Sequence, residues 1–443
     1  MLPNMRADAY TAVAGELYQH DVEPARRGAD VNLEACDYST HSPNIHQWTS
    51  VDHFCGGSWA AGVHVVRLAP GRHLDVEVGG DLRDPADKRA LPVFFSGAVV
   101  PRAGKTGPFF SGAGIAERVS SPFIALSDPV VDECGELPLA WYTGRAGDGL
   151  QDAVAMILEA AQLRYGELLL VGGSGGGFAA ILFADRIRAS ALVWNPQTDL
   201  LNYAPPIVRQ YLAAATTLTG DEIGTSDHPR RAQALIEGGI QHSITAPQGP
   251  GIKRLLYLQS ASDWHVGVHT APFIRARGLA YAAKGTWTVG ASQALFLAHF
   301  SSGHTPPPYQ TIVAGVQRLL AVEANPQEVI LSLQSDGLLP DVKEDLAPKD
   351  LQSFTSLIES NVALAVHAEP GMAPQLRLTW GRLPQGYGGM TATFRTSEGQ
   401  VLPPLPDDPH AVSLEAIGAS PSGLSATLLD GLGQPICNIH LPS

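Results

Sequence analysis

Several sequence features that this chain lacks exclude particular classes of protein. The 443 residues contain only four cysteines, and no two of them stand at C-x-x-C spacing, which argues against zinc-finger and thiol-redox motifs. No segment approaches the roughly 20 apolar residues of a membrane-spanning helix. Residues 1–8 lack the apolar run of a secretory signal peptide, so we expect a cytoplasmic location.

Basic residues are also scarce. Lysine and arginine number 29 against 43 aspartates and glutamates, which gives a formal net charge of −14. Nucleic acids and anionic membranes need basic surfaces, so neither is expected as a partner. With 44% hydrophobic residues, the chain can bury a large core and has the length of two or three domains. A disulfide between Cys36 and Cys55 is one alternative, but free thiols fit a cytoplasmic protein better.

The most informative stretch is rich in glycine. Apolar residues 168–171 lead into Gly172-Gly173-Ser174-Gly175-Gly176, and small or apolar residues continue to 184. The five residues fit G-x-S-x-G, the nucleophile elbow, in which a serine stands on a tight turn between a strand and a helix. Its neighbours must be small because the turn is strained, and the first amides of the helix favour a developing oxyanion. Ser174 is therefore the predicted nucleophile.

A glycine-rich turn can also bind phosphate or simply pack tightly. Residues 173–177 do not give a convincing G-x-G-x-x-G spacing. No acidic residue ends a strand about 20 residues later in the way that a dinucleotide site requires. The nucleophile elbow is therefore the favoured interpretation.

Residues 1–90 form a leading β-rich segment. Alternating apolar residues over 61–68 and 73–79 predict a β-hairpin. Three histidines stand at irregular spacing in or near the polar loop before it: His41, His46 and His53. A metal site among them is one alternative, but ordinary loop or strand histidines are favoured because the spacing does not match a ligand motif.

Strands and helices alternate over residues 91–322. Strands are expected at 91–98, 122–128, 168–171, 190–196, 254–260 and 294–300, and helices at 148–164, 270–284 and 308–322 as well as after the elbow. The strands are nearly all apolar, which predicts a doubly wound, mostly parallel sheet covered on both faces. The insertion at residues 197–250 carries helix-like pieces, and we expect it to act as a lid that sets specificity.

The pattern changes after residue 322. Residues 323–360 have a mixed composition that predicts a linker with short helices, and residues 361–443 alternate between apolar and polar positions with Gly, Pro, Asp and Ser turns. That alternation predicts a C-terminal β-sandwich. The predicted fold class is α/β with an accessory all-β domain, which the leading segment 1–90 could join.

A serine nucleophile needs a base, usually histidine, and the base needs a carboxylate that fixes its tautomer. In this fold the expected chain order is serine, acid, histidine, each after the carboxyl end of a strand. Ser174 follows one strand, Asp263 follows the strand at 254–260, and His304 follows the strand at 294–300. These three residues are the predicted triad.

Each partner of Ser174 has a rival. Asp199 also follows a strand, and Asp263 could instead cap a helix, but strand order favours Asp263 as the acid. His265 and His269 follow the proposed acid too closely to be the base. They are expected to line the site, and Trp264 and His265 are the predicted substrate-binding residues.

An oxyanion hole needs two backbone N–H donors. Gly175, directly after the nucleophile, is the first candidate. The second is Ser96 or Gly97, in the loop after the strand at 91–98. The reaction requires no metal and no organic cofactor.

These motifs carry a resemblance. With Ser174, Asp263 and His304 in order, residues 91–322 resemble the α/β-hydrolase superfamily. The segments G-G-S-G-G-G-F-A-A, W-N-P-Q-T-D (194–199), S-D-W-H (262–265) and G-H-T-P-P-P (303–308) resemble a poorly characterised bacterial group found near surface-glycan genes. That group is related to the glycan acetyltransferase of accessory Sec systems.

The resemblance implies esterase or acyl-transfer chemistry over about half of the chain. The favoured hypothesis is a serine hydrolase acting on a carboxylic ester, with an acetyl ester on a sugar as one substrate. An acyltransferase, an amidase or a peptidase with the same triad is the first alternative. A non-catalytic glycan- or partner-binding protein on a hydrolase scaffold is the second. The sequence does not define the oligomeric state.

Overall fold

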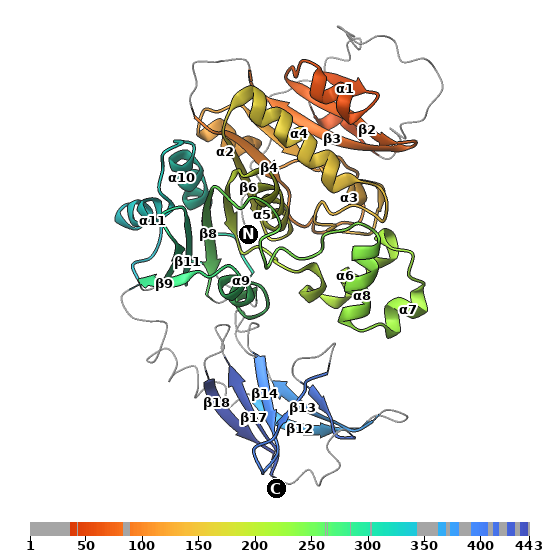
Figure 1. Ribbon diagram of the computed structural model, residues 1–443, viewed down its shortest axis with the longest axis vertical. Helices are drawn as coiled ribbons and strands as arrows, with labels where there is room; N and C mark the ends of the chain where they lie inside the picture. Colours follow the sequence, from red (N-terminus) through yellow and green to blue (C-terminus); the bar gives the residue numbers. More distant parts are fainter. Residues whose placement is uncertain are drawn as a thin grey trace.

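The computed structural model describes most of the chain in defined ranges. These are 36–41, 43–82, 89–261, 263, 265–283, 285–301, 304–342, 362–368, 373–380, 391–405, 411–415, 423–429 and 435–441. One large sheet flanked by helices forms the main body, and two small sheets follow near the C-terminus (Figure 1). The predicted fold class, a mostly parallel α/β sheet with separate β-sheets, is confirmed.

The large sheet has eleven strands in the order β1-β2-β3-β5-β4-β6-β7-β8-β11-β10-β9. They are β1 (Ile45–Trp48), β2 (Gly62–Ala69), β3 (Arg72–Gly79), β4 (Leu91–Phe95), β5 (Phe123–Leu126), β6 (Leu168–Gly173), β7 (Ser190–Trp194), β8 (Arg254–Ser260), β9 (Ala280–Ala283), β10 (Thr286–Val289) and β11 (Gln293–Ala298). Each neighbouring pair from β5 to β11 is parallel, whereas β3 is antiparallel to both of its neighbours. A short antiparallel hairpin, β9–β10, completes the far edge.

Alternation along the strands builds a core on each face of this sheet. In β6, Leu168 and Leu170 belong to one buried cluster, and Leu169 and Val171 belong to the other. This follows from the two-residue period of a strand, because successive side chains point to opposite faces. A sheet that is apolar on both faces must be covered on both, and helices cover it here.

Two sets of helices provide that cover (Figure 1). The first cluster draws on α1 (Val51–Gly56), α3 (Pro129–Glu133), α4 (Leu150–Tyr165), α5 (Gly175–Ile187), α6 (Pro205–Ala215), α7 (Gly220–Thr225), α8 (His228–Glu237) and α9 (Ala271–Ala276). The second cluster draws on α2 (Ala113–Arg118), α10 (Tyr309–Leu319) and α11 (Pro326–Ser335). Within the described ranges, no helix is long and apolar enough to cross a membrane.

Three expectations need correction. The predicted hairpin exists as β2–β3, but it pairs through β3 with β5 and so belongs to the main sheet, not to an accessory domain. The expected helix at 270–284 ends at Ala276, and the hairpin β9–β10 follows it. The mixed segment after residue 322 contains α11, whose apolar side is packed in the second core, so this part is no linker. The rest of that segment, 343–360, lies outside the described residues.

Two small antiparallel sheets make up the described C-terminal part. One has the order β12-β13-β16 and the other β15-β14-β17-β18. Their strands are β12 (Val362–His367), β13 (Gln375–Trp380), β14 (Thr391–Arg395), β15 (Val401–Leu402), β16 (Ala411–Ser413), β17 (Ser425–Leu429) and β18 (Pro435–His440). Apolar residues of both sheets, including Leu376 and Phe394, share a third buried cluster, as alternating strands of two facing sheets require.

Candidate active site

Ser174 stands on a strained turn between β6 and α5. Its backbone has φ 54° and ψ −120°, a conformation that few residues with a side chain adopt. A methyl group added at Gly176 would clash with the carbonyl oxygens of Phe95 and Ser96, and one at Gly172 would clash with the backbone of Gly176. The turn therefore needs these small residues, as the elbow motif predicted.

Strand order brings the carboxyl ends of β6, β8 and β11 to one edge of the sheet. Ser174 follows β6, Asp263 follows β8 and His304 follows β11. His304 Nε2 lies 2.9 Å from Ser174 Oγ, and His304 Nδ1 lies 2.8 Å from Asp263 Oδ2. The structure thus brings together the three residues that the sequence analysis singled out.

Asp263 is held by several donors. Its side chain is buried, and it accepts hydrogen bonds from the backbone N–H of His265 at 3.1 Å and from Gln259 Nε2 at 3.3 Å, besides the contact with His304. Burial alone would raise the pKa of this carboxyl, but the hydrogen bond from His304 and the nearby imidazoles outweigh it and lower the pKa. An ionised Asp263 fixes the proton of His304 on Nδ1, which leaves Nε2 free to accept from Ser174.

Gln197 is a residue that sequence reasoning missed. It is fully buried, its Oε1 accepts from Trp141 Nε1 at 2.7 Å, and its Nε2 donates to Ser174 Oγ at 3.0 Å. Indole N–H is a donor only, so the oxygen of the amide must face Trp141 and the nitrogen must face Ser174. One sequence signal could have found Gln197: it lies three residues beyond β7, at the carboxyl ends of the strands, where functional polar groups gather in this kind of sheet.

The loop after β4 separates the two candidates for the second oxyanion donor. The Ser96 N–H already donates to the Tyr142 hydroxyl at 2.8 Å. Gly97 lies against the elbow, since a methyl group added there would come 3.3 Å from Gly173 O and 4.0 Å from Ser174 Cβ. Gly175 is the first residue of α5, where an N–H has no acceptor inside the helix. The Ser96 N–H is therefore already engaged, and the role of Gly97 and Gly175 as oxyanion donors stays a prediction.

The rivals of Asp263 and His304 have other partners. Asp199 accepts from the Leu201 N–H at the start of a short 3-10 helix, Leu200–Asn202. His269 Nδ1 accepts from the Thr198 N–H at 3.1 Å, and burial together with the His304 charge lowers the pKa of His269 to about 3. Neither residue makes a hydrogen bond to Ser174 or His304 in the described part of the chain.

Of the two predicted substrate-binding residues, Trp264 lies outside the described residues, and His265 lies beneath the site. The His265 ring is fully buried and packs on the His304 ring with 4.0 Å between centroids. Its Nδ1 hydrogen-bonds to Asn195 O at 2.9 Å, and burial followed by the neighbouring His269 lowers its pKa strongly. The buried His265 ring therefore packs against His304, and its predicted contact with substrate stays a prediction.

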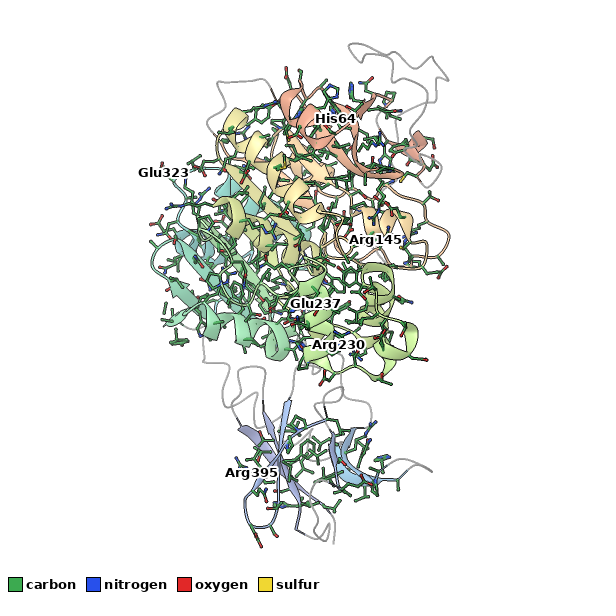
Figure 2. All side chains as sticks on the ribbon, turned by 45° about the vertical axis from the view of Figure 1, so that its right-hand side comes forward. His64, Arg145, Arg230, Glu237, Glu323 and Arg395 are labelled. Carbon is green, nitrogen blue, oxygen red and sulfur yellow. The ribbon has the colours of Figure 1, made fainter. Side chains whose placement is uncertain are left out.

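An open pocket of about 460 Å³ lies beside Gly97. Its lining includes Thr40, His41, Phe109 and Phe110. The insertion between β7 and β8 is well packed: Tyr211 of α6 is fully buried and hydrogen-bonded to Thr143 at 2.6 Å. Arg230 and Glu237 lie on α8 of this insertion (Figure 2). Its role as a lid stays a prediction.

Three features define the fold: the strand order, the serine turn after β6, and the antiparallel strand β3, which interrupts the otherwise parallel run from β2 through β5, β4, β6, β7 and β8 to β11. It is an α/β-hydrolase-like fold. No family model matches the chain, and no curated protein matches its sequence.

Several solved structures are similar at low identity. The capsule O-acetyltransferase of Neisseria meningitidis serogroup A is 12% identical over 59% of this chain and 94% of that chain, with a TM-score of 0.37. The S-formylglutathione hydrolase from Agrobacterium tumefaciens is 14% identical over 59% and 94%, with a TM-score of 0.34. The glycosylation-associated protein complex Gap123 from Streptococcus agalactiae is 14% identical over 60% of this chain, with a TM-score of 0.36, and the match spans 46% of that chain.

Proposed function

We propose that the protein is a serine hydrolase that cleaves a carboxylic ester through an acyl-enzyme. The observation that carries the proposal is the continuous chain of contacts from Asp263 Oδ2 through His304 to Ser174 Oγ, at 2.8 and 2.9 Å. These distances lie within the hydrogen-bond reach that a nucleophile and its base require. The serine also occupies the strained turn that exposes a nucleophile at the edge of the sheet.

Each residue has a defined part in the proposed reaction. Ser174 Oγ attacks the ester carbonyl while His304 Nε2 takes the hydroxyl proton, and Asp263 stabilises the imidazolium that results. The Gly175 and Gly97 amides donate to the oxygen of the tetrahedral intermediate. His304 then returns the proton to the leaving alcohol, and water releases the acyl group by the same steps. Side-chain contacts with substrate are expected from the pocket beside Gly97.

The acceptor of the acyl group distinguishes a hydrolase from an acyltransferase. The resemblance of the motifs to bacterial proteins near surface-glycan genes favours a sugar O-acyl ester as the substrate. If a sugar hydroxyl outcompetes water for the acyl-enzyme, transfer replaces hydrolysis with no change in the triad. Product analysis with and without a sugar acceptor decides between these two outcomes.

The experiment that tests the proposal is intact mass spectrometry after incubation with a fluorophosphonate. We expect one adduct per chain on the wild type and none on Ser174→Ala, because only an activated serine reacts at a useful rate. Ser39→Ala, at an exposed position in a separate segment, is the matched control and is expected to label like the wild type. A folded wild-type protein that takes up no adduct would overturn the proposal and favour a binding protein on a hydrolase scaffold.

A further inference from the structure

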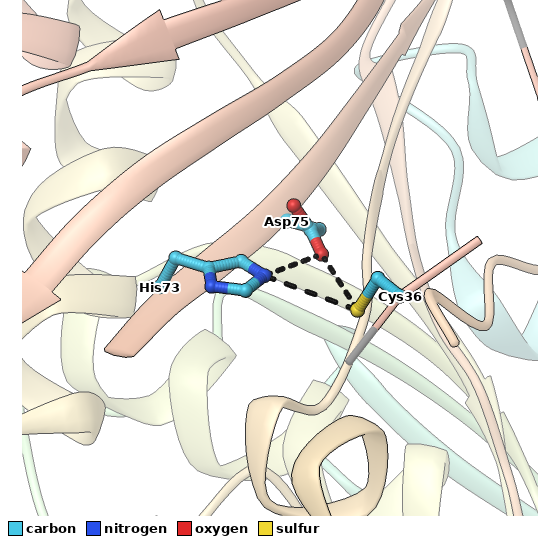
Figure 3. A group of neighbouring side chains, drawn as sticks. All are labelled: Cys36, His73 and Asp75. Carbon is cyan, nitrogen blue, oxygen red and sulfur yellow. Dashed lines mark hydrogen bonds and ion pairs between the residues drawn. The ribbon is translucent and has the colours of Figure 1, made fainter. Parts of the chain in front are cut away.

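A second group of polar side chains converges outside the candidate active site. Cys36 meets His73 and Asp75 of β3, and the three side chains point toward one another (Figure 3). His73 and Asp75 are two residues apart on a strand, so they point to the same face of the sheet. All three are buried, with 8%, 4% and 1% of their surface exposed.

The ligand atoms are spaced as they would be around a metal ion. Cys36 Sγ lies 3.9 Å from His73 Nε2 and 3.8 Å from Asp75 Oδ2, and Nε2 lies 3.3 Å from Oδ2. A zinc ion about 2.3 Å from a sulfur and about 2.0 Å from nitrogen and oxygen, at tetrahedral angles, sets such atoms about 3.3–3.6 Å apart. The observed triangle is slightly wider on the sulfur side and can hold an ion at its centre.

Tyr38 supplies a fourth polar atom beside these three. Its hydroxyl lies 3.2 Å from His73 Nε2 and 3.0 and 3.1 Å from the two carboxylate oxygens of Asp75. Tyr38 begins the short 3-10 helix Tyr38–Thr40, only two residues after Cys36, so both side chains arrive from one segment. The Tyr38 hydroxyl therefore adds an oxygen to the sulfur, nitrogen and oxygen atoms of the cluster.

Hydrogen bonding accounts for the contacts between Tyr38 and Asp75 but leaves the Cys36 thiol weakly engaged. A thiol is a weak donor, and its contacts here are 3.8 and 3.9 Å long. A second buried carboxylate, Asp132, lies against Gly107, the residue with which Cys36 forms an isolated β-bridge. Burial and the nearby Asp75 raise the pKa of the Asp132 carboxyl well above its usual range, which the Ser127 hydroxyl and Arg102 oppose. A divalent cation among the donors of the cluster would place a positive charge beside these two buried acidic groups.

We propose that Cys36 Sγ, His73 Nε2 and Asp75 Oδ2 bind one zinc ion, with the Tyr38 hydroxyl as the fourth ligand. Thiolate, imidazole and carboxylate are all ligand types that zinc accepts, and a tetrahedral set with no open position is typical of a structural site. Binding releases the thiol proton of Cys36 to solvent. This site is separate from Ser174 and does not depend on the proposed reaction.

The ion would fasten one segment of the chain to the sheet. Residues 36–41 contain two of the proposed ligands, and Thr40 and His41 at the end of the segment line the pocket beside Gly97. Zinc would therefore keep one wall of that pocket in place. Its removal is expected to loosen this segment and to weaken substrate binding without touching the serine.

The test is a zinc-binding experiment on the full chain. Protein stripped with a chelator is reloaded with zinc chloride, and the bound metal is measured by mass spectrometry of the elements. We expect one zinc per chain for the wild type and for Cys55→Ser and His53→Gln, which change a cysteine and a histidine outside the cluster. Cys36→Ser, His73→Gln and Asp75→Asn should each lower the affinity by at least about tenfold, the range seen when a metal site loses a supporting group.

Cobalt(II) gives a second readout that can be taken on the wild-type protein itself. Cobalt bound to the wild type should show the near-ultraviolet charge-transfer band of a metal–thiolate bond, and Cys55→Ser should keep that band. Wild-type protein that binds no zinc, or binds cobalt without a thiolate band, overturns the proposal. So does zinc that persists in Cys36→Ser but is lost in His304→Gln, since Asp263, His265 and His304 also lie close enough to hold an ion.

Discussion

Gln197 Nε2 donates a 3.0 Å hydrogen bond to Ser174 Oγ, the same oxygen that lies 2.9 Å from His304 Nε2. Because Oγ accepts from Gln197, its own hydrogen is left to donate to His304 Nε2. The amide cannot turn round, since its oxygen is engaged by Trp141. Gln197 is therefore a positioning residue that holds the serine hydroxyl in the rotamer from which it transfers its proton.

Replacing Gln197 tests that role. Gln197→Glu keeps an acceptor for Trp141 but turns a carboxylate oxygen toward Ser174 Oγ. We expect the fluorophosphonate rate to fall about 10- to 100-fold, because the hydrogen bond to Oγ is lost and a buried charged group is left without that partner. The measurement is the second-order labelling rate together with the melting temperature. Gln241→Glu, at a partly buried position beside Arg186, is the control and should label at the wild-type rate. Equal rates for both variants would contradict the assignment.

The two candidate acids can be separated by matched variants. Asp263→Asn cannot fix the Nδ1–H tautomer of His304, and we expect kcat on an ester to fall about 10³- to 10⁴-fold, as in other triads. Asp199→Asn keeps a side-chain oxygen that can cap the short 3-10 helix and should leave kcat within a few-fold of the wild type. Steady-state kinetics on one chromogenic ester measures both. A larger loss in Asp199→Asn than in Asp263→Asn would reverse the assignment.

The folded state needs small residues in the turn around Ser174. In Gly176→Ala the new methyl group meets two backbone carbonyl oxygens, which cannot move aside as a flexible side chain could. We expect a loss of about 1–3 kcal/mol in the free energy of unfolding, measured by urea denaturation. Gly220→Ala is the control, because it opens α7 and no atom lies within 4 Å of the added methyl group. Equal stability of the two variants would disprove the steric argument.

Buried neutral histidines predict a loss of stability in acid. His64 lies among packed side chains of the N-terminal strands (Figure 2). Burial lowers its pKa to about 4, and the nearby His46 acts in the same direction, while the hydrogen bond to Ala60 O opposes the shift. Its Nδ1 accepts from Trp48 Nε1 at 2.9 Å and its Nε2–H donates to Ala60 O at 2.8 Å, which is the neutral tautomer.

The pH dependence of stability follows from proton uptake by His64. Between pH 6.5 and about 4 the unfolded chain protonates this imidazole and the folded chain does not, so stability falls as the pH is lowered through that window. Tryptophan-detected urea unfolding at pH 7.5 and pH 5 should give a lower midpoint at pH 5. His64→Gln can keep both hydrogen bonds without titrating, and its midpoint should change less between the two pH values. An unchanged pH dependence would show that other groups dominate.

Local sequence patterns were enough to predict the serine turn and the class of fold. The run of apolar residues, the glycines around Ser174 and the helix after them are near neighbours, so steric rules for one turn were enough to predict the elbow. The parallel sheet followed from apolar strands alternating with helices. Strand order along the chain also singled out Asp263 and His304, because the carboxyl ends of parallel strands gather at one edge.

Contacts between distant segments needed the tertiary structure. Whether the hairpin β2–β3 joined the main sheet depended on its pairing with β5, about 45 residues later, which no local pattern encodes. Gln197 points at Ser174 only because Trp141 and β7 fix its amide. The histidine of the proposed zinc site is His73, not the histidines of the preceding loop, because β3 places it opposite Cys36. The sequence determined the serine, its order of partners and the class of fold, whereas packing across the sheet decided which side chains meet.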